Sequence, residues 1–137
     1  MPSQEGGSTV SVPEELYYTA EHEWISISDE TARVGITDYA QRALGDVVYV
    51  TAPQPGTRVT AGDPCGEVES TKSVSDIYSP ADGEVSEINA EIDEDPGLVN
   101  SDPYGAGWLF RIQLDSADLP PGLLSAAEYS ALTQEEQ

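Results

Sequence analysis

Residues 66–80 read GEVESTKSVSDIYSP, and polar and apolar positions alternate along them as they do in a β-strand. One continuous strand does not satisfy the pattern, because Val68 and Val74 would face one side of the sheet and Ile77 the other. A turn centred on Lys72 removes the conflict, since the second half of the stretch can then run back beside the first. The pattern therefore predicts a β-hairpin with Lys72 at its tip.

Lys72 is the only lysine in the chain, and the other four basic residues are arginines. The lone lysine is either what remains by chance in an acidic composition or a primary amine needed for chemistry. An amine can be acylated or can form an imine, whereas a guanidinium stays protonated and unreactive. Glu67, Glu69 and Asp76 lie nearby in the sequence and favour the ammonium form, which argues against an enzyme that uses Lys72 as a Schiff-base nucleophile.

The N-terminal half has the pattern of a small antiparallel β-protein. Residues 24–36 alternate with a period near two and predict a hairpin that turns at residues 29–30. Thr37 is a candidate N-cap and Gly45 a helix stop, so one or two helical turns are expected between them, followed by a strand over residues 47–51. Turn sequences rich in Pro, Gly and Asp recur at intervals of roughly ten residues, which favours an antiparallel sandwich or barrel.

The C-terminal part predicts one more strand and a closing helix. Residues 108–114 form a strand pattern with one apolar face, made by Trp108, Phe110, Ile112 and Leu114. Residues 125–132 predict a short helix that begins at Ser125. We expect both tryptophans, Trp24 and Trp108, in the core.

Composition limits the function classes. The 137 residues are the usual size of one domain, and we expect a flexible tail over residues 1–12 and a single domain over residues 13–137. A formal charge of −21, from 26 acidic and 5 basic residues, would repel a phosphate backbone and excludes nucleic acid as a partner. No stretch reaches the roughly 18 apolar residues of a spanning helix, and we expect no secretory signal. Cys65 is the only cysteine, which excludes an internal disulfide and favours a reducing cytoplasm.

Several motifs resemble those of one family and occur in the same order. The segment ESTKSVSD at residues 69–76 closely resembles the lipoylation motif of the glycine cleavage system H-proteins. The likeness extends from Leu16 to Tyr129. The other matching segments are HEW at residues 22–24, GITDYA at 35–40, LGD at 44–46 and LVNSDPYGAGW at 98–108.

The resemblance implies a mainly β fold of the lipoyl/biotinyl type. This fold is a barrel-sandwich hybrid of short antiparallel strands with a few short helices, including one at the C-terminus. The resemblance also implies that Lys72 carries lipoic acid through an amide bond. The residues implied for the lipoylation motif and its recognition are Glu69, Ser70, Ser75 and Asp76.

A member of this family is implied to be a carrier and not an enzyme. It would shuttle the aminomethyl group of glycine on lipoyl-Lys72 from the pyridoxal-phosphate-dependent glycine decarboxylase, the P-protein, to the aminomethyltransferase, the T-protein, which uses tetrahydrofolate. Dihydrolipoamide dehydrogenase, the L-protein, would reoxidise the dithiol, and a lipoate-attaching enzyme would load Lys72. A prokaryotic, cytoplasmic protein with neither nucleic-acid nor membrane partners is expected.

Two carboxylates match family positions that hold the loaded arm in a surface cleft. We hypothesise that Glu23 and Asp76 accept hydrogen bonds from the protonated aminomethyl group. The alternative is that each is a solvated carboxylate on its strand. Ala43 offers no polar group where some relatives carry a histidine.

Three other features have plainer interpretations. His22 is the only histidine, and because no nucleophile is identifiable beside it, we expect a hydrogen-bonding residue at a strand end. The acidic run at residues 91–95 lacks the ordered spacing of a calcium loop, so a solvated turn is expected, with no metal bound. Cys65 is interpreted as a small packed residue.

Four alternatives remain open at this point. A lipoyl domain of a 2-oxo acid dehydrogenase would share the fold and the modified lysine, but such domains usually carry Asp-Lys-Ala and lack the flanking H-protein segments. A biotin carrier would place methionines around its lysine, whereas Met1 is the only methionine. The others are the Schiff-base enzyme and an acidic interaction protein that carries no modification.

Overall fold

The computed structural model describes residues 11–116, 120 and 122–136, and in this part of the chain it has nine strands and four helices. The strands are β1 (Tyr17–Tyr18), β2 (Glu23–Ser28), β3 (Thr31–Ile36), β4 (Val47–Thr51), β5 (Arg58–Val59), β6 (Pro64–Ser70), β7 (Val74–Tyr78), β8 (Gly83–Ile88) and β9 (Phe110–Leu114). The helices are α1 (Asp38–Leu44), α2 (Ala90–Glu94), α3 (Leu98–Ser101) and α4 (Ala126–Glu136).

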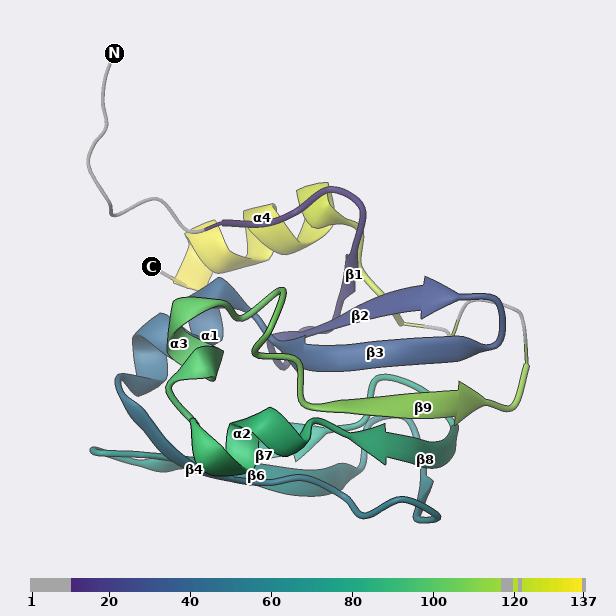
Figure 1. The fold of residues 1–137 in the computed structure, drawn as a ribbon. Helices are drawn as coiled ribbons and strands as arrows, with labels where there is room; N and C mark the ends of the chain where they lie inside the picture. The colour runs from purple at the N-terminus through teal and green to yellow at the C-terminus, as the bar shows by residue number, and fades with distance from the viewer. Residues whose placement is uncertain (1–10, 117–119, 121, 137) are drawn as a thin grey trace.

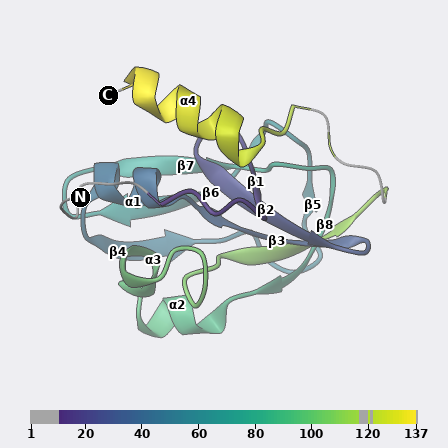
Figure 2. The ribbon, with the colours of Figure 1, turned by 90° about the horizontal axis from the view of Figure 1, so that it is seen from above.

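The strands form two antiparallel sheets that lie face to face (Figure 1). One sheet has six strands in the order β1-β2-β3-β9-β8-β5, and the other has three in the order β4-β6-β7. Helices α1 and α3 lie together at one end of the layers, whereas α4 lies beside the edge strand β1 (Figure 2). This arrangement confirms the predicted fold class, a mainly β sandwich of short strands with a few short helices.

Apolar side chains from both sheets fill the space between them. The core comprises Ile25, Ala32, Val34, Ile36, Leu44, Val47, Val50, Val59, Val68, Ile77, Ala81, Val85, Ile92, Val99, Leu109, Phe110, Ile112 and Leu114. A second cluster of Tyr18, Trp24 and Tyr129 attaches α4 to β1 and β2. Trp24 is buried as expected, and its indole N–H donates to the carbonyl of Pro103 at 2.9 Å.

The local elements of the N-terminal half confirm the sequence predictions. The β2–β3 hairpin turns at residues 29–30, where Asp29 has a φ of 59°. Helix α1 begins after Thr37, whose hydroxyl accepts from the Ala40 N–H at 3.1 Å. It ends at Gly45, whose φ of 83° is open to glycine at little cost.

Helix α4 also begins where expected. The Ser125 hydroxyl accepts from the Glu128 N–H at 3.2 Å, and the Glu128 carboxylate accepts from the Ser125 N–H at 2.9 Å, which is a capping box. The helix continues to Glu136 and so extends about one turn beyond its predicted end. Neither α4 nor any other helix in the described ranges is long and apolar enough to cross a membrane.

Trp108 is not the core residue that the sequence predicted. Strand β9 begins only at Phe110, so the alternation that buries Phe110, Ile112 and Leu114 does not include Trp108. The Trp108 ring is half-buried and lies under two guanidinium groups, with the Cζ atoms of Arg33 and Arg111 at 5.2 and 5.4 Å from its centre. Cation–π contact therefore covers a ring that the sandwich core does not hold.

The acidic run at residues 91–95 forms most of helix α2 and not the predicted turn. Asn89 caps the helix by accepting from the Glu91 N–H at 3.1 Å, and Ile92 is buried in the core. One anchored apolar residue and a cap are enough to fold the run as a helix, while its carboxylates stay exposed.

Residues 1–10 of the expected N-terminal tail lie outside the described residues. The last two residues of that segment contact the folded chain. The Ser11 N–H donates to the Asp38 carboxylate at 2.9 Å, and the Ser11 carbonyl accepts from the Tyr104 hydroxyl at 2.6 Å. Val12 packs against the second hydrophobic cluster.

Candidate functional site

Lys72 lies in the turn between β6 and β7, where the sequence predicted a hairpin tip. The last paired residues of the two strands are Glu69 and Val74. Ser70 shapes the turn, because its N–H donates to the Ser73 carbonyl at 2.8 Å and its hydroxyl accepts from the N–H groups of Lys72 and Ser73 at 3.3 and 3.1 Å. These bonds explain how the hairpin turns without the usual glycine.

Two contacts hold the tip against the end of α1. The Thr71 N–H donates to the Asp46 carbonyl at 3.0 Å. The Lys72 side chain lies over Gly45, where a Cβ atom would stand 3.5 Å from Lys72 Cε. Gly45 thus ends α1 and also lies beside the Lys72 side chain, where an added Cβ atom would make an ordinary van der Waals contact. The sequence predicted only the helix end, because no local pattern shows that residues 45 and 72 are neighbours.

The Lys72 side chain is exposed, and within the described ranges it forms no salt bridge. Its acidic neighbours Glu67, Glu69 and Asp76 are exposed as well. The amine is therefore accessible to another protein, and it stands on a turn that its own backbone hydrogen bonds hold in shape.

A cleft of about 330 Å³, here called the β7–α1 cleft, lies beside this hairpin. Strand β7 is an edge strand and borders the cleft, α1 forms another wall, and residues 21–23 contribute a third. Strand β7 runs about 13 Å from Val74, beside the turn, to Tyr78. The lining residues are Glu21, His22, Glu23, Ile36, Tyr39, Ala40, Ala43, Leu44, Val68, Ser73, Val74, Ser75 and Asp76.

Glu23 lies in the wall of the β7–α1 cleft and is only 1% exposed. One carboxylate oxygen accepts from the Thr19 hydroxyl at 2.7 Å and the other from the Tyr78 N–H at 3.0 Å. Burial raises the pKa of Glu23 to about 7, although both hydrogen bonds act in the opposite direction. The interpretation of Glu23 as a solvated carboxylate is therefore wrong, since the unpaired edge of β7 offers an N–H that draws the side chain inward.

The predicted site residues divide into two groups. Ser75 and Asp76 are exposed and line the β7–α1 cleft together with the buried Glu23. Glu69 does not line the cleft, and Ser70 is the buried residue that shapes the turn. The structure thus brings both hypothesised arm-binding carboxylates to one cavity beside Lys72.

The aromatic wall of this cleft was not identified from the sequence. The rings of His22 and Tyr39 stack with centroids 4.7 Å apart. His22 has a φ of 73°, and its carbonyl accepts from the Thr37 N–H at 3.0 Å, which confirms its role as a hydrogen-bonding residue at a strand end. The sequence predicted helical turns that contain Tyr39 but could not show which residue its ring contacts. Ala43 lies in the same lining and contributes only apolar surface.

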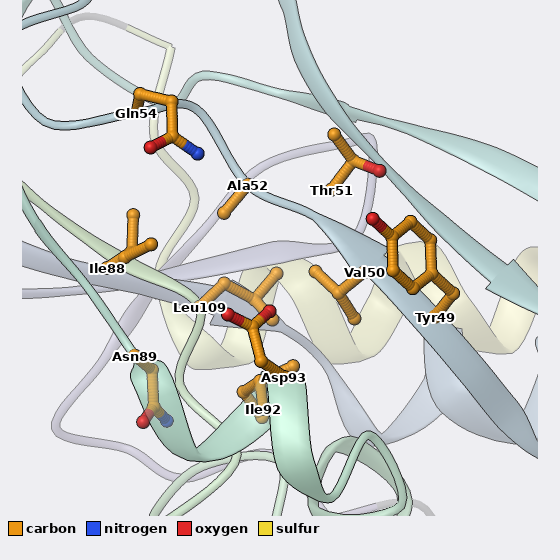
Figure 3. A pocket seen from close by; sticks show the side chains of 10 residues that line it. All are labelled: Tyr49, Val50, Thr51, Ala52, Gln54, Ile88, Asn89, Ile92, Asp93 and Leu109. Carbon is orange, nitrogen blue, oxygen red and sulfur yellow. The ribbon is translucent and has the colours of Figure 1, made fainter.

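A second hollow, of about 180 Å³, lies between β4 and α2 (Figure 3). Apolar side chains such as Ile92 and Leu109 line part of it. The Asn89 amide is already engaged, since it donates to the carbonyls of Ala106 and Trp108 at 2.8 and 2.7 Å. None of the site residues predicted from the sequence lines this hollow, so we interpret it as a packing feature.

Cys65 lies in β6 and packs half-buried against the core. Burial raises the pKa of its thiol to about 12, so very little thiolate forms near neutral pH. The interpretation of Cys65 as a packed residue is confirmed. Among the described residues, no group of three or more His, Cys, Asp or Glu side chains is placed to hold a metal ion.

Comparison with known proteins identifies the family of this chain. The family model for the glycine cleavage H-protein matches residues 16–136. The chain belongs to the glycine cleavage H-protein family. The glycine cleavage system H protein of Mycobacterium tuberculosis (strain H37Rv) is 64% identical over 123 residues, which are 89% of this chain and 87% of that relative. The H protein of Thermobifida fusca is 54% identical over 127 residues, which are 93% of this chain and 99% of that relative.

A solved H-protein structure has the same fold. The crystal structure of the glycine cleavage system H protein from Mycobacterium marinum superposes with a TM-score of 0.83 at 46% identity, and the match covers 90% of this chain and 99% of that one. The resemblance found in the sequence motifs is therefore confirmed, and so is the lipoyl-carrier fold.

Family membership also shows what kind of component this chain is. It is a non-catalytic carrier of the glycine cleavage system and not an enzyme, as the motifs implied. Its family implies a lipoyl cofactor, and the other proteins of the glycine cleavage system as partners.

Proposed function

We propose that the Nζ atom of Lys72 is the attachment point of the lipoyl group, and that the β7–α1 cleft receives the loaded arm. One observation carries the proposal. The only lysine of the chain stands exposed on a turn that opens onto a cleft with a buried carboxylate in its wall. Glu69, Ser70, Ser75 and Asp76 then serve as the motif that a lipoate-attaching enzyme recognises, with Ser70 acting through the shape of the turn.

The residues present fit a lipoyl amide. Acylation removes the charge of Lys72 and takes the formal net charge from −21 to −22, and it breaks no salt bridge of the described residues. When bound, the lipoyl group supplies a disulfide that can be reduced and whose thiols can hold a one-carbon amine. Ala40, Ala43 and Leu44 line the α1 side of the cleft and offer contact to an aliphatic arm.

The buried Glu23 suits a cationic cargo. An isolated buried carboxylate resists ionisation, and a cation placed beside it favours the ionised form. A protonated aminomethyl nitrogen is such a cation, so Glu23 and Asp76 accept charge-assisted hydrogen bonds from it within the cleft. Loss of the cargo to water would consume one water molecule and would produce a free thiol, formaldehyde and ammonium. By binding the nitrogen and covering the arm, the cleft slows that loss.

The partners follow from the same chemistry. A lipoate-attaching enzyme must reach Lys72 first, and the P-protein, the T-protein and the L-protein must then reach the arm in turn. A single exposed attachment point on a stiff turn serves all four, and a tethered arm raises the effective concentration of its cargo at each partner. We propose the cytoplasm of a prokaryotic cell as the location, and the lone cysteine supports a reducing compartment.

Intact-mass measurement tests the attachment. The chain is co-expressed with a lipoate-attaching enzyme, as wild type and as Lys72→Arg, which keeps the charge at that position. We expect one lipoyl group on the wild type and none on Lys72→Arg, with fragment masses that place the group on Lys72. An unmodified wild type, or lipoylation that survives the substitution, would overturn the proposal. Trapping of a carbonyl substrate by borohydride would instead support the Schiff-base enzyme.

A further inference from the structure

A single phenol from α4 connects two walls of the β7–α1 cleft. The Tyr129 hydroxyl lies 2.7 Å from His22 Nδ1 and 2.7 Å from Thr37 Oγ1. His22 lines the cleft and directly precedes Glu23. Thr37 is the N-cap of α1, which forms the opposite part of the lining. No described residue of the C-terminal helix lines the cleft, and Tyr129 reaches the cleft wall through His22 and the start of α1 through Thr37.

His22 needs such support because its backbone is in the left-handed region, with a φ of 73°. For a residue other than glycine this conformation is strained and persists where surrounding contacts determine it. Several contacts do so here. The His22 N–H donates to the Thr19 carbonyl at 3.1 Å, and the His22 carbonyl accepts from the Thr37 N–H. The His22 ring stacks on Tyr39, and its Nδ1 atom is hydrogen-bonded to the Tyr129 hydroxyl.

The hydroxyl is not required to fill space. Tyr129 is fully buried, and its ring stacks on Tyr18 with centroids 4.7 Å apart and an interplanar angle of 9°. A phenylalanine would make the same stack. A buried hydroxyl loses its hydration and regains little net free energy from its new hydrogen bonds, so its main effect is to select one arrangement of its partners.

We propose that Tyr129 is a positioning residue for the carrier, holding His22 and the start of α1 in the arrangement that places Glu23 beside the cargo. The inference rests on the function proposed above and extends it to a residue in the C-terminal helix. It assigns that helix a role at the cleft, whereas packing alone would make it only a cover for β1 and β2.

The test compares two tyrosines of the same cluster. Tyr129→Phe removes the bridging hydroxyl and keeps the stacked ring. Tyr18→Phe is the matched control, because Tyr18 is equally buried and its hydroxyl donates to the Pro13 carbonyl, away from the cleft. Both variants are lipoylated and loaded with the aminomethyl group, and formaldehyde release is timed. We expect release from Tyr129→Phe to be about three to ten times faster, because the hydroxyl no longer links His22 and Thr37, and release from Tyr18→Phe to match wild type.

A second readout needs no lipoyl group. Nitrogen NMR of the His22 imidazole in the unmodified chain reports its tautomer and hydrogen bonding. The His22 signals should move in Tyr129→Phe and stay in place in Tyr18→Phe. His22→Phe, which keeps a ring to stack on Tyr39 but lacks Nδ1, should shorten the cargo lifetime as Tyr129→Phe does, and it provides the comparison if Tyr129→Phe folds poorly.

The outcomes separate this inference from the proposed function. Intact mass shows whether each variant carries a lipoyl group, so an unmodified wild type refutes the attachment site whatever the lifetimes are. With Lys72 lipoylated in every variant, an unchanged lifetime in Tyr129→Phe, or equal shortening in Tyr18→Phe, overturns the positioning role. Equal shortening would mean that the lifetime follows the stability of the cluster and not the bridge to His22.

Discussion

At the scale of single residues, the site depends on two ionisable groups in opposite surroundings. Lys72 is exposed and forms no salt bridge in the described part of the chain, so its amine can be reached and modified. Glu23 is buried, with both oxygens hydrogen-bonded and its pKa raised to about 7. One group is suited to modification by an enzyme and the other to holding a positive charge out of water.

The raised pKa of Glu23 predicts a specific pH dependence of stability. The folded protein binds this proton more tightly than the unfolded chain, where the pKa is near 4.5, so stability falls as the pH rises from about 4.5 to about 7. Replacing Glu23 by Gln removes this loss. The free energy of unfolding of Glu23→Gln, measured with denaturant relative to that of wild type, should therefore increase by up to about 3 kcal/mol from pH 4 to pH 8. Glu67→Gln, at an exposed carboxylate, should show no such increase in the free energy of unfolding. Free energies of unfolding that change in parallel with pH for Glu23→Gln and wild type would contradict the prediction.

The two cleft carboxylates should protect the cargo. Glu23→Gln and Asp76→Asn each remove a negative charge from the cleft but keep the size of the side chain. In loaded protein, each should shorten the time to formaldehyde release by about tenfold, since a charged hydrogen-bond partner contributes about 1.5–3 kcal/mol when well placed and less when exposed. Glu69→Gln, outside the cleft lining, is the control. Unchanged lifetimes in both cleft variants would remove these carboxylates from the mechanism.

At the scale of elements, the β6–β7 hairpin combines access with rigidity. Ser70 closes the turn, the Thr71 N–H donates to the Asp46 carbonyl in the loop after α1, and the lysine side chain lies beside Gly45. The edge strand β7 then leads from the turn to the Tyr78 N–H that binds Glu23. One short strand therefore connects the attachment point with the carboxylate proposed to receive the cargo.

Removing the Ser70 hydroxyl should loosen the turn without unfolding the protein. We expect Ser70→Ala to cost about 1 kcal/mol of stability and to slow lipoylation of Lys72 several-fold, because the amine is then presented in more than one orientation. Ser86→Ala is a suitable control. The Ser70 hydroxyl donates to the Ser73 carbonyl at 3.2 Å, and the Ser86 hydroxyl likewise donates to a backbone carbonyl, but on the exposed face of β8. Lipoylation at the wild-type rate in Ser70→Ala, measured by intact mass over time, would show that presentation of Lys72 does not depend on the hydrogen bonds of the Ser70 hydroxyl.

At the scale of the whole molecule, the excess of negative charge remains largely unneutralised. In the described ranges, three arginines pair with carboxylates, in the pairs Arg42–Asp38, Arg58–Asp115 and Arg111–Glu87. With 26 acidic residues in the chain, most carboxylates have no cation beside them. A field of this sign attracts basic docking surfaces and repels anions.

Steering by this field predicts that loading depends on salt. Raising ionic strength shortens the screening length from about 10 Å at 0.1 M to a few Å at 1 M. The kcat/KM of a lipoate-attaching enzyme for this carrier should fall by about tenfold over that range, through KM and not kcat. Activation of free lipoate by the same enzyme does not involve the carrier and serves as the control. If neither kcat/KM nor the control changes with ionic strength, the excess of acidic residues has another cause, such as solubility in a salt-rich habitat.

Much of this protein could be predicted from short-range patterns. The β2–β3 hairpin, the Thr37 cap, the Gly45 stop, the Lys72 turn and the Ser125 start of α4 all depend on neighbouring residues, so periodicity and turn chemistry suffice. The prediction for Trp108 was wrong because strand parity cannot show where a strand begins. The turn predicted at residues 91–95 is a helix because burial of Ile92 outweighs the polar composition.

Residue types and their local spacing were enough to predict the lone amine at a turn, the antiparallel β class and the family. The packed fold was needed to show that Glu23 is buried, that Gly45 lies beside Lys72, and that Tyr129 reaches His22 and Thr37 across the chain. Burial and hydrogen bonding between distant residues depend on how the two sheets and α4 pack, and a local pattern contains no information on that packing.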